Sequence, residues 1–166
     1  MEILDIKNEM NENKLKEIAK GIKNGKLWLF PTETVYGIGS NGLDEKAVEK
    51  IYVAKKRSRK NPINLLVSDI EMIEKIAQDI SPLEYKLMEA FFPGPFTIIL
   101  KKKSVVPSIV TANSDFVGVR MPSGNIARKL VQLAGVPIAA PSANISGELS
   151  GTNLKDVIDE FSTCLD

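Results

Sequence analysis

A lysine on the apolar side of an expected helix is the first residue in this chain with a clear capacity for chemistry. Lys55 follows Val48, Ile51 and Tyr52 at spacings of seven, four and three residues. On a helix, these spacings place Lys55 on the face that otherwise packs inward. If the helix frays before residue 55, the ammonium instead reaches water along the surface. The sharper interpretation is that Lys55 and Arg57 form the wall of an anion-binding cavity.

Basic residues gather in two short segments. The segment 55–60 reads KKRSRK and residues 101–103 are all lysine, although the formal net charge of the chain is only +1. The positive potential is therefore local, and it suits anionic groups such as phosphates and carboxylates at particular places. Arg59 and Lys60 would lie in solvent at the rim of the cavity, or at most face RNA.

Polar turns follow two of the apolar segments. The first, PTETVYGIGS at 31–40, offers hydroxyls and glycines, but it lacks the rest of a dinucleotide-binding fingerprint and is most simply a turn. The second, PSANISG at 141–147, carries Ser142 and Asn144 directly after an apolar run. Side chains of these types usually hydrogen-bond to the local backbone. At the end of a sheet, the same turn would instead offer polar groups to an anion.

The composition excludes several kinds of chemistry. The chain has no histidine, so Ser-His-Asp hydrolysis, Cys-His catalysis and histidine-ligated zinc are excluded. Cys164 is the only cysteine, which excludes an internal disulfide and argues against a thiolate metal site. The sequence has no P-loop motif. Because it shows no signal-peptide pattern and no long apolar stretch, we predict a cytoplasmic protein without a membrane span.

One domain must position these residues. A chain of 166 residues, 43% hydrophobic and 26% charged, is typical of a single globular domain with a sizeable core. Helical spacing and cap residues predict helices at 13–25, 44–52, 81–91, 125–134 and 153–162. Apolar segments predict strands at 26–30, 63–68, 96–101, 116–120 and 136–140. We therefore expect a layered α/β domain, with a mixed sheet because some strands lack intervening helices.

Over residues 20–160 the motifs follow one another in the order PTETVYG, Lys-x-Arg, Asn-Pro, a Pro-Gly-Pro turn, VRMP, and PSANxSG followed by a threonine and a helix. Taken together, this order of motifs resembles the YrdC-like family of threonylcarbamoyl-AMP synthases. The resemblance implies an open, twisted, mixed α/β sheet with flanking helices around a basic cavity. It also implies a single YrdC-like domain over residues 1–166.

The resemblance further implies an activity. Members of the family are nucleotidyltransferases that join L-threonine, bicarbonate and ATP into L-threonylcarbamoyl-AMP and pyrophosphate. Their product is the activated intermediate for the t6A37 modification of tRNA, and the tRNA threonylcarbamoyl transferase machinery consumes it. Mg²⁺ would arrive with ATP, bridging phosphate oxygens, and no dedicated protein metal site is implied. Two alternatives stay open: a non-catalytic protein that binds double-stranded RNA or tRNA, and a relative that uses another amino acid.

Site residues are implied where this chain matches the family motifs. The implied nucleotide site comprises Lys55, Arg57, Asn61, Ser142, Asn144 and Ser150. The catalytic residues among them are Lys55, Arg57, Ser142 and Asn144. Of these, the two basic side chains would neutralise phosphate and carboxylate charge, and the two polar ones would hold the nucleotide. Thr34 and Arg120 match the L-threonine positions, where the Arg120 guanidinium would bind the amino acid's carboxylate as a fork.

Three features depart from the family pattern. Ser58 follows Arg57 where the family usually has proline, which should loosen the loop but leave the charges intact. Leu66 stands where many members have a histidine near threonine and others an apolar residue, so the identity of the amino acid stays open. The sequence stops at Asp166, whereas family members usually continue with a segment whose serine and arginine contact ATP. Without that segment, nucleotide binding would be weak or would need a partner.

Overall fold

The computed structural model describes residues 12–148 and 154–162, where helices flank one six-stranded sheet. The helices are α1 (Glu12–Lys23), α2 (Glu45–Ala54), α3 (Ile70–Ile76), α4 (Pro82–Phe91), α5 (Asn125–Ala134) and α6 (Leu154–Phe161). The strands are β1 (Trp28–Pro31), β2 (Tyr36–Asn41), β3 (Leu65–Leu66), β4 (Ile98–Lys101), β5 (Phe116–Arg120) and β6 (Ile138–Ala139). None of the helices in the described ranges is long and apolar enough to cross a membrane.

The sheet has the order β1-β2-β6-β3-β5-β4. Strands β3 and β5 run parallel, and the other neighbouring pairs are antiparallel. The prediction of a mixed sheet is therefore confirmed. Because β6 pairs with both β2 and β3, it connects the N-terminal hairpin β1–β2 to the rest of the sheet.

Local sequence signals account for most of the helix boundaries. The Asp44 side chain accepts backbone hydrogen bonds at the start of α2, as its cap position predicts. Ser81 and Glu84 form a reciprocal capping box at the start of α4. Helix α5 ends at Gly135, whose φ of 67° suits the left-handed cap conformation. The predicted helices at these places are confirmed.

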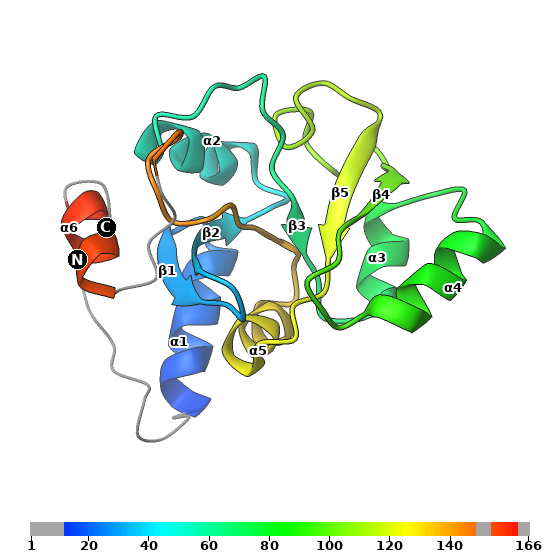
Figure 1. The fold of residues 1–166 in the computed structure, drawn as a ribbon, viewed down its shortest axis with the longest axis horizontal. Helices are drawn as coiled ribbons and strands as arrows, with labels where there is room; N and C mark the ends of the chain where they lie inside the picture. Colours follow the sequence, from blue (N-terminus) through cyan, green and yellow to red (C-terminus); the bar gives the residue numbers. More distant parts are fainter. Residues whose placement is uncertain (1–11, 149–153, 163–166) are drawn as a thin grey trace.

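The N-terminal helix packs through one apolar face. Its buried residues are Leu15, Ile18, Ala19 and Ile22. Helix α1 contacts α5 and β2, and α5 in turn contacts β1. Figure 1 shows α1 and α5 next to the hairpin β1–β2, while α3 and α4 lie beside β4 and β5. The buried apolar residues of all these elements form one hydrophobic core, whose removal from water stabilises the fold.

Strand β2 occupies a segment that the sequence predicted to be a turn. Its glycines are not turn residues here, because neighbouring side chains need the space beside them. A Cβ atom on Gly39 would lie 2.8 Å from Ile138 Cγ2 and 2.9 Å from Phe30 Cε1. The glycine therefore permits side chains from both neighbouring strands to pack across β2.

Two further elements differ from the sequence prediction. Helix α3 was not predicted, although the Asp69 side chain caps it by accepting a 2.8 Å hydrogen bond from the Met72 N–H. Strand β3 has two residues rather than the predicted 63–68. The N–H groups of Ile63 and Val67 still hydrogen-bond to neighbouring segments, so the chain stays held on both sides of the short strand.

Candidate active site

A cavity of about 280 Å³ lies where four distant segments of the chain converge. These are the turn between β1 and β2, the loop after α2 together with the end of β3, the end of β5, and the segment after β6. Four residues that the resemblance implied line it directly: Thr34, Arg57, Arg120 and Ser142. The volume is near the lower end of the range for small-molecule sites. The fold therefore brings two guanidinium groups and two hydroxyls to one cavity.

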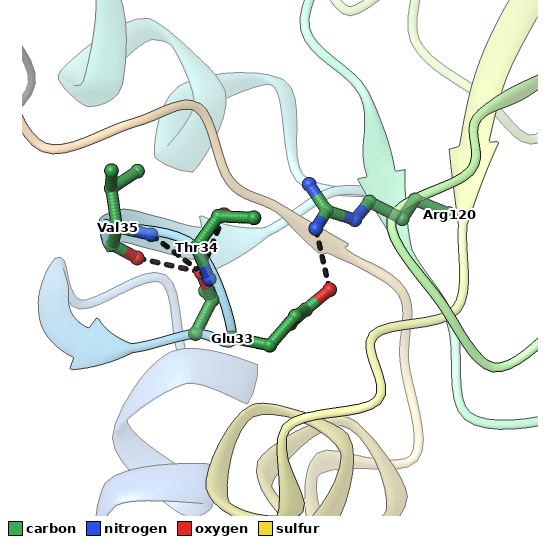
Figure 2. Close-up of polar contacts among 5 residues, drawn as sticks. Glu33, Thr34, Val35 and Arg120 are labelled. Atoms are coloured by element: carbon green, nitrogen blue, oxygen red, sulfur yellow. Dashed lines mark hydrogen bonds and ion pairs between the residues drawn. The ribbon is translucent and has the colours of Figure 1, made fainter.

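The hairpin turn 32–35 presents Thr34 to the cavity in a fixed conformation. Figure 2 shows the hydrogen bonds within this turn. The Thr32 hydroxyl donates to the Val35 carbonyl at 2.6 Å and accepts from the N–H groups of Thr34 and Val35, each at 3.3 Å. The Thr34 hydroxyl oxygen lies 3.2 Å from that of Thr32. Because its own turn supplies these bonds, Thr34 is positioned before any ligand binds.

Arg120 forms an ion pair with Glu33 across the cavity (Figure 2). Its Nη2 donates to Glu33 Oε1 at 2.5 Å, and the two side chains are only 22% and 17% exposed. Burial raises the pKa of the Glu33 carboxyl. Its own backbone N–H, the hydrogen bond and positive charge of Arg120, and the nearby Gly124 N–H outweigh that effect and hold the pKa of Glu33 below its ordinary value. Glu33 is thus a carboxylate facing the guanidinium that was predicted to bind an amino acid's carboxylate.

Arg57 lines the cavity from the loop that follows α2. Its Nε donates to the Asn61 carbonyl at 3.2 Å and its Nη2 donates to the Pro62 carbonyl at 2.9 Å. These bonds brace the loop and leave other donors of the guanidinium for an anion. The Asn61 side chain does not line the cavity, so its predicted nucleotide contact stays a prediction.

Lys55 faces inward, as its spacing predicted, and is 1% exposed. Its Nζ donates to the Ser142 carbonyl at 2.5 Å and to the Asn144 carbonyl. Burial, with a smaller contribution from the charge of Arg57, lowers the pKa of Lys55 to about 8, and Glu160 partly opposes this. The cavity lining includes Arg57 but not Lys55. In this structure the ammonium holds the Ser-x-Asn segment in place.

The Ser-x-Asn segment is fixed by further hydrogen bonds on both sides. Ser142 Oγ donates to Asn144 Oδ1 at 2.6 Å. The Ala143 N–H donates to the Tyr36 carbonyl at 2.7 Å, which joins this segment to the start of β2. The Ile145 N–H donates to the carboxylate of Glu160 on α6. Ser142 therefore lines the cavity while Asn144, which is buried, shapes the turn behind it.

Three other residues of the basic segments 55–60 and 101–103 have partners outside the cavity. Arg59 forms an ion pair with Glu49, with Nε 3.1 Å from Oε2, and its side chain is 60% exposed. Lys101 lies 2.7 Å from Asp79. Lys103 donates to a backbone carbonyl of α3 at 2.6 Å. Two charges of the basic segments are therefore already paired with carboxylates.

Three remaining predictions concern the surroundings of the site. Leu66 is buried and lines the cavity, so an apolar group faces the ligand where many family members have histidine. Ser150 lies outside the described residues. Within the described ranges, no group of three or more histidine, cysteine, aspartate or glutamate residues has an arrangement that holds a metal ion.

Sequence reasoning missed Glu33, the carboxylate that pairs with Arg120. The PTET motif already placed this residue between the two threonines, but nothing in the sequence pointed to a basic partner. Asn64, which also lines the cavity, was missed too. Its position beside the Asn-Pro motif was the available signal.

Replacing Lys55 with methionine is expected to remove a pH dependence of stability. The pKa of Lys55 is about 8 in the folded protein against an ordinary 10.5, so the unfolded chain binds more protons between these values. The free energy of unfolding should therefore rise with pH through this window, by about 3 kcal/mol from this group, and should gain nothing from it below pH 8.

Urea denaturation of the wild type and Lys55→Met across that pH range measures this difference. Lys60→Met is the matched control, because Lys60 is exposed and should leave the pH slope unchanged. Equal slopes for the wild type and Lys55→Met would contradict the buried, depressed ammonium.

Comparison with known proteins identifies the family. The sequence profile of Sua5/YciO/YrdC proteins, described as "Telomere recombination", matches residues 20–166. The threonylcarbamoyl-AMP synthase of Pyrococcus abyssi is 45% identical over 159 residues, covering 96% of this chain and 47% of that protein. That of Bacillus subtilis is 38% identical, covering 93% of this chain and 45% of its own length. This chain thus spans about half the length of these relatives.

The fold agrees with that of a solved relative. The crystal structure of P. abyssi Sua5 complexed with L-threonine has a TM-score of 0.91 at 45% identity, covering 94% of this chain and 46% of that one. The predicted YrdC-like fold is therefore confirmed. The profile match over most of the chain and the shared fold lead to one conclusion: this chain belongs to the Sua5/YciO/YrdC family.

Proposed function

We propose that this chain is a threonylcarbamoyl-AMP synthase, which makes L-threonylcarbamoyl-AMP and pyrophosphate for the t6A37 modification of tRNA. The observation that carries the proposal is the convergence of Arg57, Arg120, Thr34 and Ser142 on one cavity. The relatives named above and the L-threonine complex of P. abyssi Sua5 support the choice of substrate. Because its product carries an AMP group taken from ATP, the enzyme is a nucleotidyltransferase.

The reaction proceeds in two steps. The neutral amine of L-threonine attacks the carbon of bicarbonate, forming a C–N bond and releasing water, which leaves a carbamate. A carbamate oxygen then attacks the α-phosphorus of ATP, and the bond between that phosphorus and the bridging oxygen breaks as pyrophosphate leaves. No covalent bond to the protein forms, so the protein contributes by positioning three reactants and by stabilising negative charge.

The lining residues divide this work according to their chemistry. Arg120 binds the amino acid's carboxylate, and the Thr34 hydroxyl lies in the same part of the cavity. Arg57 stabilises charge that develops on the phosphate, and Ser142 contacts the nucleotide. Lys55 acts through the segment 142–144, whose carbonyls it holds. Mg²⁺ would come with ATP and would neutralise phosphate charge; the acidic side chain of the lining, Glu33, is already paired with Arg120.

Two other functions rank below this one. A double-stranded RNA or tRNA binder would use the basic segments, but Arg59 and Lys101 are already paired with carboxylates. A synthase for another amino acid would use the same cavity with Leu66 against a different side chain. In the leading proposal, the tRNA threonylcarbamoyl transferase machinery consumes the product in the cytoplasm, where ATP, bicarbonate and tRNA are all present.

The decisive experiment measures pyrophosphate and the adenylated product together. Purified protein is incubated with ATP, Mg²⁺ and bicarbonate, and with L-threonine, L-serine or L-valine in parallel. Pyrophosphate release and a product with the mass of threonylcarbamoyl-AMP are expected with L-threonine, and much less with L-valine, which lacks the hydroxyl. Equal turnover with L-valine would favour another amino acid. RNA binding that weakens steeply with salt, without pyrophosphate release, would favour the RNA binder.

A further inference from the structure

The Glu33 carboxylate connects three parts of the structure at one edge of the cavity. Glu33 belongs to the turn 32–35, pairs with Arg120 at the end of β5, and lies beside Gly124 before α5, where a Cβ atom on Gly124 would be 3.5 Å from Glu33 Oε2. Its contact with Gly124 is close, since a Cβ atom there would lie 3.2 Å from the Glu33 backbone nitrogen. The carboxylate thus fixes the turn to two other elements.

The start of α5 has no negative charge of its own. The N-cap residue Gly124 makes no side-chain hydrogen bond, and the first turn of α5 contains no acidic residue. Helix N-termini have unsatisfied N–H groups and a partial positive charge. The Glu33 carboxylate, which belongs to the hairpin turn, places a negative charge next to this helix start.

The Arg120 guanidinium keeps donors for a ligand after pairing with Glu33. Figure 2 shows Arg120 reaching toward the turn, with Glu33 contacting one of its terminal nitrogens. Its Nε is buried and has no hydrogen-bond partner among the described residues. A guanidinium presents five N–H donors in a planar fork. The bond to Glu33 therefore fixes the orientation of the Arg120 guanidinium and leaves its other N–H groups available to a ligand.

We infer that Glu33 is a positioning residue for amino-acid binding, which orients the Arg120 guanidinium and holds the turn that carries Thr34. This inference rests on the proposed function, because it assigns the two oriented groups to the amino-acid end of that reaction. Glu33 itself does not contact the amino acid. Because of Glu33, Arg120 and Thr34 are already in place when the ligand arrives. Binding therefore loses less conformational entropy of side chains and loop.

The inference predicts a direction of change that simple charge reasoning does not. If Glu33 merely occupied the carboxylate position, its neutralisation would free Arg120 and strengthen amino-acid binding. If Glu33 orients Arg120, the same neutralisation weakens binding. Glu33→Gln separates these cases, because glutamine keeps the shape of the side chain and removes its charge.

Calorimetry and steady-state kinetics test this direction. Glu33→Gln is expected to raise the Kd and KM for L-threonine about 10-fold or more, with kcat and the Kd for ATP within about 2-fold of the wild type. Glu89→Gln is the matched control, because Glu89 is exposed on α4 away from the cavity. In an Arg120→Lys background, Glu33→Gln should add little, since the two residues act as one unit. Tighter or unchanged L-threonine binding in Glu33→Gln would overturn the inference.

A second readout is independent of the proposed function. In the protein without ligands, the Arg120 Nε–H signal in an NMR spectrum should be sharp in the wild type and in Glu89→Gln, and broadened in Glu33→Gln. If the wild type binds no L-threonine, the proposed function fails, and this signal still decides whether Glu33 orients Arg120. An unchanged Arg120 signal in Glu33→Gln would overturn the inference, and thermal unfolding verifies that every variant is folded.

Discussion

Replacing Arg57 with alanine is expected to lower kcat for pyrophosphate release about 100- to 1,000-fold. Arg57 lines the cavity from the loop after α2, and its guanidinium is the cation of that loop facing the space where the phosphate would lie. In an enclosed site, a cation that stabilises charge developing in the transition state affects kcat more than substrate binding. Steady-state assays with ATP, Mg²⁺, bicarbonate and L-threonine measure the loss.

Arg59→Ala provides the control in the same loop. Arg59 is paired with Glu49 and does not line the cavity, so its removal should change kcat little. Arg57→Lys, which keeps the charge but loses the fork that braces Asn61 and Pro62, should retain part of the activity. An equal loss of kcat in Arg57→Ala and Arg59→Ala would contradict a specific role for Arg57. It would mean that the loop acts only through the electrostatic potential of its total positive charge.

Arg120→Lys is expected to raise the KM for L-threonine about 100-fold while the KM for ATP changes little. Lysine keeps the positive charge, but it has no planar fork with which to hold Glu33 and bind a second carboxylate at once. Initial rates at varied L-threonine and saturating ATP measure this effect.

Arg128→Lys is the matched control for that substitution. Arg128 lies on α5 and donates to the Ser68 carbonyl at 3.1 Å, outside the cavity lining. Its replacement should leave both KM values near those of the wild type. If Arg120→Lys raised the KM for ATP as much as that for L-threonine, Arg120 would belong to the nucleotide end of the cavity.

Features that depend on local spacing could be predicted from the sequence. The helical period placed Lys55 on the inward face, one of the two orientations that the sequence left open, and the cap residues located the starts of α2 and α4. Helix α3 was not predicted because its seven residues span only two turns, too few for a clear period. Strand β2 was mistaken for a turn because glycine is also used where side chains from other strands need room.

The candidate site required information that no local pattern contains. The motif residues were identified by resemblance, but their mutual placement depends on the sheet order. Glu33 and Arg120 are 87 positions apart, and only the closed fold makes one the partner of the other. The hydrogen-bond partners of the Lys55 ammonium likewise could not be predicted, because they are backbone carbonyls of a segment far along the chain.

The central position of the two-residue strand β6 has a consequence for synthesis on the ribosome. Among the described strands, β6 pairs with both β2 and β3, and the backbone that follows it, at Ala140 and Ala143, hydrogen-bonds to the same two parts of the sheet. Until this segment has emerged from the ribosome, the nascent chain has unpaired strand edges on the hairpin β1–β2 and on the set β3–β5–β4. Such edges favour aggregation. We therefore expect the sheet to close only after this segment has left the ribosome, in a step that also completes the cavity.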